Sequence, residues 1–258
     1  VDNILGESVF PSTDRYIGPA IKNAGVWEQD EVNWIFKNSL EGMTCINAGA
    51  TVGYHAMMFS KAVGPSGKVY AYEPSSEIFE LLEINLLNQN MKNVKAIKKA
   101  LGASQGEIRL YLNEINCGDN RCFDPKKVED MHGTFRDHGF AEEPRHEQVE
   151  LTTLDLEFGN DKVDIIFMDV QGFEFEVLDG AEGILEKHRP KIILEFSPDW
   201  YDNIGVDYRK HLLDLEEKYS YKISMLGKEL KPVNHINEVV DLMKKTKTQN
   251  IDILLDCR

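Results

Sequence analysis

The sequence predicts an α/β fold in which helices cover a largely parallel, doubly wound sheet. From about residue 43 onward, short apolar segments rich in β-branched residues alternate with longer segments whose apolar residues recur every three or four positions. This alternation indicates parallel strands joined by crossover helices. A chain of 258 residues suits one domain that can bury a substantial core.

The first half of the chain contains the clearest elements. Strands are expected at 43–48, 68–73 and 94–98, and an additional strand at 107–112. A helix at 54–63 ends at the turn residues 64–67, and Pro74 and Ser75 open a second helix, in which Ile78, Leu82 and Leu86 share one face. These elements predict two consecutive strand–helix units.

Residues 113–147 are polar, rich in glycine and proline, and show no periodicity. So long a stretch without regular structure is typical of a binding loop, a lid or a disordered insertion. Regular structure is expected to resume at 149–156, followed by strands at 163–169, 190–196, 221–226 and 251–256 and helices at 174–187, 207–218 and 239–245. We therefore divide the chain into an N-terminal helical segment, 1–42, packing at the ligand cleft, and a main domain, 43–258.

A glycine turn follows the first predicted strand. Gly49 and Gly53 stand between that strand and the next helix, where glycine allows positive φ and a close approach of the backbone to a ligand. Glu73 ends the second strand about twenty residues later, where an acidic side chain can accept hydrogen bonds from both hydroxyls of a ribose. Together they predict a nucleoside-binding cleft.

The spacing within this turn excludes two other nucleotide sites. Thr51 and Tyr54 occupy positions where a dinucleotide-binding turn has glycine, and no phosphate-binding loop with lysine is present. The ligand is better interpreted as an adenosine derivative without a pyrophosphate, and S-adenosylmethionine fits. A nicotinamide-dependent dehydrogenase is a distant alternative.

The sequence resembles the FkbM-type methyltransferases, a branch of the class I S-adenosylmethionine-dependent enzymes with a Rossmann-like fold. The resemblance runs from about residue 25 to 226 and rests on residues 25–28, 46–53, 64–74 and 153–155, and above all on 169–174 and 178–181. It implies a seven-stranded sheet whose last strand is antiparallel. It also implies methyl transfer to oxygen, commonly on sugars or polyketide-like natural products. Under it, Gly49 and Gly53 would line the methionine part of the cofactor, and Glu73 would hold the ribose.

Two residues depart from the family pattern, which usually has aspartate at Asn47 and glutamate at Gln171. With asparagine in place of aspartate at position 47, the attraction for the positively charged end of the cofactor would be weaker. Loss of the glutamate charge at Gln171 would alter contact with the substrate. A catalytically weakened, cofactor-binding scaffold is therefore an alternative, as is a methyltransferase that acts on nitrogen or on a macromolecule.

Asp169 is the first candidate for the catalytic base, because it ends a buried strand where acceptor and methyl group would meet, beside the cofactor. Capping of the following helix is its alternative role. Glu195 ends the neighbouring strand, and the two carboxylates could instead hold a divalent cation such as Mg²⁺. His132, like His138 and His146, lies in the polar insertion and could act as the base if that segment closes as a lid.

The substrate site is expected at the start of the insertion. Asn116, Asp119 and Arg121, with the neighbouring Asn120, form a polar cluster suited to hydrogen-bonding a sugar or an acid, and Gln171 is expected to join them. Ordinary solvation of a loop is the alternative. His55, on the first helix, is expected to be a packed helix residue.

Composition restricts the partners. The net charge of −15 disfavours binding of nucleic acid, and no apolar run is long enough to cross a membrane. The scattered cysteines, Cys45, Cys117, Cys122 and Cys257, indicate free thiols rather than a disulfide framework or a metal cluster. No signal peptide is visible, so we expect a soluble, cytoplasmic protein that acts on a small-molecule acceptor; the oligomeric state stays open.

Overall fold

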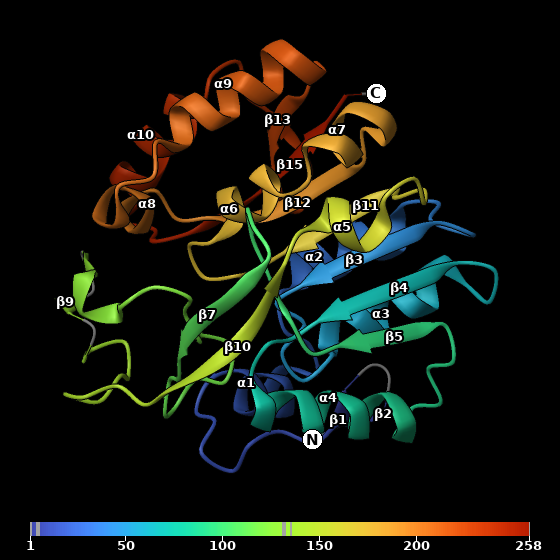
Figure 1. The fold of residues 1–258 in the computed structure, drawn as a ribbon, viewed down its shortest axis with the longest axis vertical. Coiled ribbons are helices and arrows are strands. Elements are labelled where there is room, and N and C mark those ends of the chain that lie inside the picture. The colour runs from blue at the N-terminus through green and yellow to red at the C-terminus, as the bar shows by residue number, and fades with distance from the viewer. Residues whose placement is uncertain (1, 4–5, 131–132, 135, 258) are drawn as a thin grey trace.

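A computed structural model describes residues 2–3, 6–130, 133–134 and 136–257 of the chain (Figure 1). Its centre is a sheet that has eight strands in the described residues. From edge to edge these are β14 (Lys231–Pro232), β13 (Lys222–Met225), β15 (Ile251–Asp256), β12 (Lys191–Phe196), β11 (Ile165–Met168), β3 (Thr44–Ala48), β4 (Lys68–Tyr72) and β5 (Val94–Ile97).

The direction of the strands confirms the expected topology. β5, β4, β3, β11 and β12 pair in parallel, whereas β15 is antiparallel to both of its neighbours, β12 and β13. These seven strands match the predicted mostly parallel sheet with an antiparallel last strand. The eighth, β14, is a two-residue strand that the sequence did not predict, and it extends the edge at β13.

Helices cover both faces of the sheet. One apolar cluster joins it to α1 (Ile17–Ala24), α2 (Gln29–Lys37), α3 (Tyr54–Val63) and α4 (Ser76–Asn88). The other joins it to α5 (Leu154–Phe158), α6 (Glu174–Asp179), α7 (Glu182–His188), α8 (Pro198–Ile204), α9 (Tyr208–Tyr219) and α10 (Ile236–Thr246). None of the helices in the described part of the chain combines the length and apolarity needed to span a membrane.

The pleat of the central strands explains their continuous apolar sequence. On β3, Cys45 packs in the α1–α4 cluster and Ile46 packs in the opposite one. On β11, Phe167 and Met168 divide in the same way. Because both faces of a parallel sheet are buried, such strands lack the alternation of polar and apolar residues seen in half-exposed strands.

A second, smaller sheet stands beside the main one. It contains β6 (Ala100–Leu101), β10 (His146–Thr152) and β7 (Gly106–Tyr111), in that order. β7 and β10 are antiparallel arms of a long hairpin, side by side in Figure 1, and the polar insertion connects them. A separate pair, β1 (Asp2–Asn3) and β2 (Gly6–Glu7), precedes α1.

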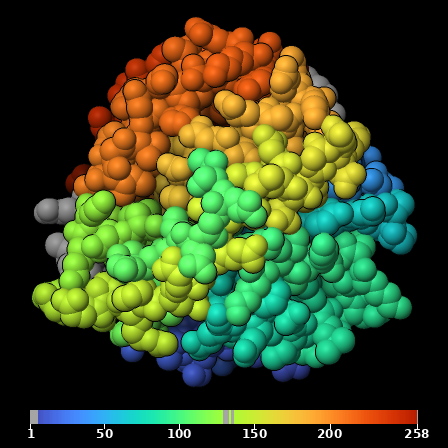
Figure 2. All heavy atoms as spheres, viewed as in Figure 1, coloured from blue at the N-terminus to red at the C-terminus, as the bar shows by residue number. Residues whose placement is uncertain are grey.

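The described part of the insertion is mostly loop, as the sequence predicts, and contains only a few short elements. The insertion contains a 3-10 turn at Pro125–Lys127, the pair β8 (Glu129–Asp130) and β9 (Gly133–Thr134), and a bridge between Tyr111 and Arg121. Figure 2 shows the insertion, in light green, directly against the orange C-terminal helices. Its order comes from side-chain contacts distant in sequence, which periodicity does not reveal.

The single helix predicted at 174–187 is two helices, α6 and α7. The first helix ends at Gly180, where a Cβ atom would lie 2.0 Å from the carbonyl oxygen of Gly102 and only glycine fits. Asp155 then starts α7 by accepting hydrogen bonds from the amides of Gly183 (2.8 Å) and Ile184 (3.0 Å). A carboxylate from another element therefore caps this helix.

Two further boundaries differ from prediction. The regular segment expected at 149–156 is the end of β10 and the start of α5, where the Thr153 hydroxyl caps the helix by accepting from Leu156 N (3.1 Å). α8 was not predicted, although Pro198 at its first turn and Gly205 at its end are typical boundary residues.

Candidate functional site

The two glycines of the turn after β3 both have positive φ, 76° at Gly49 and 92° at Gly53. A Cβ atom at Gly49 would lie 1.9 Å from the carbonyl oxygen of Asp169, and one at Gly53 would lie 2.6 Å from Leu82 Cδ1. The missing side chains therefore make room for the turn after β11 and for α4. The positive φ at both glycines agrees with the prediction, and packing against Asp169 and Leu82 is a further reason for the missing side chains.

Glu73 joins the end of β4 to this turn. Its Oε2 accepts a hydrogen bond from Thr51 N (2.9 Å), and its Oε1 accepts one from Ser75 N (2.9 Å). Burial raises the pKa of Glu73 to about 7, although these two backbone donors act to lower it. A carboxylate offers about four acceptor positions, so two remain for a ligand.

A pocket opens between this turn and the turn after β11. Its volume is about 520 Å³, including space open to solvent. Its walls include Gly49, Thr51, Glu73, Leu101, Asp169, Gln171 and Phe173 from the sheet edge, and Cys117, Gly118, Asn120 and Cys122 from the insertion. Of the cofactor residues predicted from the sequence, Gly49, Glu73 and Asp169 line this pocket; Asn47 and Gly53 do not.

Asn47 is fully buried on β3, one register step below the pocket. Neither its Oδ1 nor its Nδ2 has a hydrogen-bond partner among the described residues. A buried amide without hydrogen bonds lowers the stability of the folded protein. Asn47 therefore carries a cost that the apolar residues beside it on β3, Ile46 and Ala48, do not.

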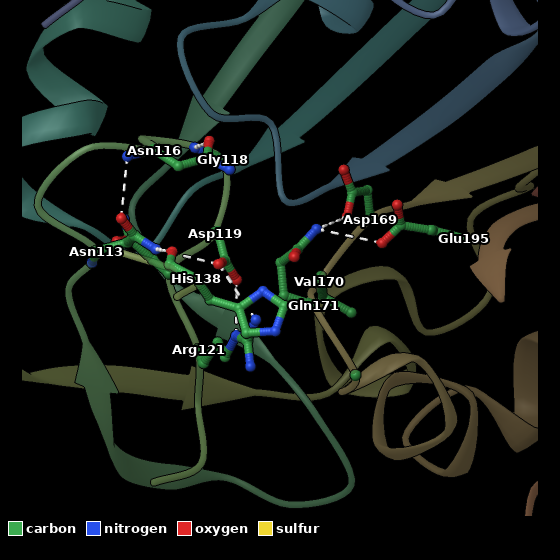
Figure 3. Close-up of polar contacts among 12 residues, drawn as sticks. Asn113, Asn116, Gly118, Asp119, Arg121, His138, Asp169, Val170, Gln171 and Glu195 are labelled. Atoms are coloured by element: carbon green, nitrogen blue, oxygen red, sulfur yellow. Dashed lines mark hydrogen bonds and ion pairs between the residues drawn. The ribbon is translucent and has the colours of Figure 1, made fainter. Parts of the chain in front are cut away.

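Asp169 and Glu195, at the ends of β11 and β12, are joined by one side chain. The Gln171 amide Nε2 donates to Asp169 Oδ1 and, at 3.3 Å, to Glu195 Oε2 (Figure 3). Gln171 has φ 54°, and this left-handed backbone turns its side chain back over the strand ends. The structure thus brings together three of the predicted site residues.

Burial makes these carboxylates unusual. Burial, followed by the Glu174 carboxylate, raises the pKa of Asp169 to about 7, against the hydrogen bond from Gln171. Burial, followed by the carboxylates of Asp169 and Glu28, raises the pKa of Glu195 well above its ordinary range. Asn250 Nδ2 also donates to Glu195 Oε1.

Glu174 fixes the turn that carries Asp169 and Gln171. Its Oε1 accepts from Val170 N (3.1 Å) and Gly172 N (3.2 Å), and its Oε2 accepts from the Tyr201 hydroxyl (2.9 Å). α6 has no side-chain cap, so the alternative role of Asp169 as its cap is wrong. Glu174 lies within the resemblance motif, but its role as the centre of the turn was missed.

The N-terminal segment reaches the same edge of the sheet. The Tyr54 hydroxyl accepts a hydrogen bond from Trp27 N (3.1 Å). Burial, and then the Asp169 carboxylate, raise the pKa of Glu28 well above its usual value. Glu28, which belongs to the motif at 25–28, therefore interacts electrostatically with Asp169, although it does not line the pocket.

Asp119 and Arg121, both predicted to contact substrate, form an ion pair with each other. Arg121 Nε and Nη2 donate to the two Asp119 oxygens at 2.6 and 3.2 Å, and Arg121 is fully buried. Its guanidinium lies 4.2 Å from the centre of the Trp200 ring on α8. Asn116 Oδ1 accepts from Gly118 N (3.1 Å) and shapes a local turn. The alternative of a solvated loop is wrong for this ion pair, because both side chains are buried.

The histidines offer less support as bases. His132 lies outside the described residues. The His138 ring packs edge-on against Trp200, and the His146 ring lies 5.8 Å from that of Tyr111. Burial lowers the pKa of His55 to about 3, so this helix residue is neutral where its Nε2 approaches Glu28 Oε2 (3.3 Å).

Within the described residues, no three His, Cys, Asp or Glu side chains are grouped so that they could hold a metal ion. The divalent cation considered for Asp169 and Glu195 therefore gains no support. All four cysteines are free thiols, as expected.

Comparison with known proteins agrees with this geometry. The family described as Methyltransferase FkbM domain matches residues 47–223. The crystal structure of Methyltransferase FkbM from Methylobacillus flagellatus KT superposes with a TM-score of 0.51 at 13% identity, covering 83% of this chain and 43% of that one. At this identity the likeness shows the fold alone.

Two curated fungal relatives match part of the chain. Methyltransferase 1 of Beauveria bassiana is 24% identical over 144 residues, which is 53% of this chain and 57% of the relative. Methyltransferase sdnD of Sordaria araneosa is 27% identical over 157 residues, or 53% of this chain and 60% of the relative. The chain thus spans less than two thirds of the length of either relative.

Proposed function

Because the chain belongs to the FkbM-domain methyltransferase family, we propose that it transfers a methyl group from S-adenosylmethionine to a hydroxyl oxygen of a small molecule. The observation that carries this proposal is the pocket at the carboxyl edge of the sheet, which both Glu73 and Asp169 line. A sugar or a polyketide-like compound is the acceptor class we favour. The net charge of −15 supports a small molecule over a nucleic acid.

The residues of the pocket fit the cofactor. Glu73 keeps acceptor positions for the two ribose hydroxyls, because each of its oxygens accepts a single backbone hydrogen bond. Gly49 adds bare backbone to the wall. When bound, S-adenosylmethionine supplies a methyl group on a positively charged sulfur. A pKa of about 7 lets Asp169, which lines the pocket, carry a negative charge that favours this sulfur near neutral pH.

Asp169 is the side chain that we assign as the base. A pKa of about 7 lets its carboxylate take a proton from an acceptor hydroxyl near neutral pH. Gln171 holds one oxygen of Asp169 and orients the carboxylate. Glu195 Oε2 accepts a hydrogen bond from the same Gln171 amide (3.3 Å). We therefore assign it to holding Gln171.

Calorimetric titration with S-adenosylhomocysteine tests cofactor binding directly. The wild-type protein should bind, and Glu73→Ala should bind at least tenfold more weakly, since two hydrogen bonds to the ribose are lost. Absence of wild-type binding at millimolar ligand would remove the proposal.

Turnover on a panel of hydroxylated small molecules tests the chemistry, with the mass gain of one methyl group as the readout. Asp169→Asn keeps the shape of the side chain and should retain S-adenosylhomocysteine binding, while kcat falls by about 10²- to 10⁴-fold. Unchanged kcat in Asp169→Asn would refute its role as the base.

A cofactor-binding scaffold without catalysis is the second candidate. The observation in its favour is that the Gln171 amide lies between Asp169 and Glu195, where an acceptor would have to approach. Binding of S-adenosylhomocysteine without methylation of hydroxyl, amine or macromolecular acceptors would support it. Methylation of amines or of a macromolecule alone would change the acceptor class and keep the enzyme.

A further inference from the structure

Residues 117–122 form a strip of the insertion whose two faces have different roles. Cys117, Gly118, Asn120 and Cys122 line the pocket, whereas the intervening Asp119 and Arg121 do not. Those two side chains form the buried ion pair that lies against Trp200. One face of the strip therefore covers the pocket, and the other packs against Trp200; we call this strip the roof of the pocket.

Asn113, which precedes the roof in the chain, is hydrogen-bonded to two of the roof residues. Its Nδ2 donates to Asp119 Oδ2 (3.0 Å) and to the carbonyl oxygen of His138 (2.7 Å), as Figure 3 shows. Its own backbone amide donates to Asn120 Oδ1 (2.9 Å). The roof is thus fixed at Asp119 and at Asn120.

The contact with Asn113 determines how the Asn120 amide is oriented. A backbone N–H can only donate, so the atom of Asn120 that faces it must be the carbonyl oxygen. The NH₂ group of Asn120 consequently points away from Asn113 N. No described residue accepts a hydrogen bond from it. Asn120 lines both this pocket and a neighbouring one, and Asn113, which faces its carbonyl oxygen, lines only the neighbouring one.

The pocket around Asn120 offers few other donors. Leu101, Leu110 and Phe173 are apolar, and burial raises the pKa of Cys122 to about 12, which keeps this thiol neutral. Lys99 also lines the pocket, but its Nζ pairs with Glu150 (2.8 Å) and Glu157 (3.0 Å). Asn120 is the roof side chain with a strong donor to offer.

We propose that Asn120 is a specificity-determining residue that donates a hydrogen bond from Nδ2 to a ring nitrogen of the adenine base of the cofactor. The inference rests on the proposed function, since it needs an adenosine-bearing ligand in this pocket. Purine ring nitrogens accept hydrogen bonds and asparagine amides commonly donate to them. Asp119 and Arg121 act through the strip as positioning residues and do not touch the ligand.

The test measures dissociation constants for S-adenosylhomocysteine in wild type, Asn120→Ala and Asn120→Asp. Loss of one neutral hydrogen bond should weaken binding by roughly 3- to 10-fold in Asn120→Ala. Asn120→Asp keeps an acceptor for Asn113 N but has no donor, so it should weaken binding at least as much. Asn88→Ala, at an exposed position of α4, is the control and should bind like wild type.

Analogues of S-adenosylhomocysteine that lack one ring nitrogen identify the contact. The 1-, 3- and 7-deaza compounds are compared with S-adenosylhomocysteine itself. In wild type, one of the three should bind more weakly than S-adenosylhomocysteine. In Asn120→Ala, that same compound and S-adenosylhomocysteine should bind equally well. Equal binding of S-adenosylhomocysteine by wild type and Asn120→Asp would overturn the inference. So would deaza losses that are the same in wild type and Asn120→Ala. Failure of wild type to bind S-adenosylhomocysteine would instead defeat the proposed function.

Discussion

The carbonyl oxygen of Asp169 occupies the space in which a side chain at Gly49 would begin, 1.9 Å from the ideal Cβ position. The two residues end neighbouring parallel strands, β3 and β11, and both line the pocket. Their close approach sets the distance between the turn that would hold the cofactor and the carboxylate that would take the proton. Gly49 therefore connects the fold with the proposed chemistry.

Gly49→Ala should lower the free energy of unfolding by about 3 kcal/mol or more, because positive φ and the clash with Asp169 both penalise a Cβ atom. Gly25→Ala is the matched control: Gly25 has φ 77°, but no neighbouring atom lies within 4 Å of its Cβ position. Its cost should be near 1 to 2 kcal/mol, from backbone strain alone. Urea unfolding followed by circular dichroism measures both, and equal costs would contradict the packing argument.

Removal of Arg121 should destabilise the protein strongly. Arg121→Met leaves the buried Asp119 carboxylate without its partner, at an expected cost of about 3 to 5 kcal/mol. The double variant Asp119→Asn/Arg121→Met should recover part of that loss. Lys126→Met, which removes the exposed pair with Glu143, should cost no more than about 1 kcal/mol. Additive losses in the double variant would show that the pair is not coupled.

Binding of S-adenosylhomocysteine should weaken as the pH falls below about 7. Burial raises the pKa of Glu73 to about 7 in the free protein, and ribose hydroxyls favour the charged carboxylate that accepts from them. The dissociation constant should therefore rise by up to about tenfold per pH unit below that value. In Glu73→Gln, binding is weaker at pH 8 and this slope is reduced; an unchanged slope assigns the titration to another group.

Titration of Asp169 should make the free protein more stable as the pH falls, whereas ligand binding weakens as the pH falls. Its folded pKa of about 7 lies above the ordinary 3.8, so the folded state binds this proton more tightly than the unfolded state does. The contribution of Asp169 to stability is therefore present at low pH and is lost as the pH rises through about 7. Asp169→Asn, which does not titrate, should gain roughly 2 kcal/mol relative to wild type between pH 5 and pH 8.

Chemical unfolding of both proteins at the two pH values measures this difference. Asp161→Asn, at an exposed position, provides the control substitution. A relative stability of Asp169→Asn that does not change with pH would mean that Asp169 is ionised in the folded protein at both values.

The sequence by itself determined the order of the sheet elements and the edge at which the site lies. Apolar runs identified β3, β4, β11 and β12, since strands buried on both faces need apolar residues throughout. Glu73 and Asp169 follow β4 and β11, and Glu195 is the last residue but one of β12; parallel strands bring their carboxyl ends to one edge. Local pattern was sufficient because each of these facts depends on residues close together in the chain.

The tertiary structure alone decided how the site is closed and which polar residues face it. Nothing in the spacing of Asp119 and Arg121 shows that they pair with each other against Trp200, some eighty residues further on. Nor does it show that Asn120, between them, faces the pocket, or that Gly53 makes room for Leu82. These contacts depend on segments that are distant in sequence and that become buried together when the chain folds. The spacing of residues along the chain therefore does not predict them.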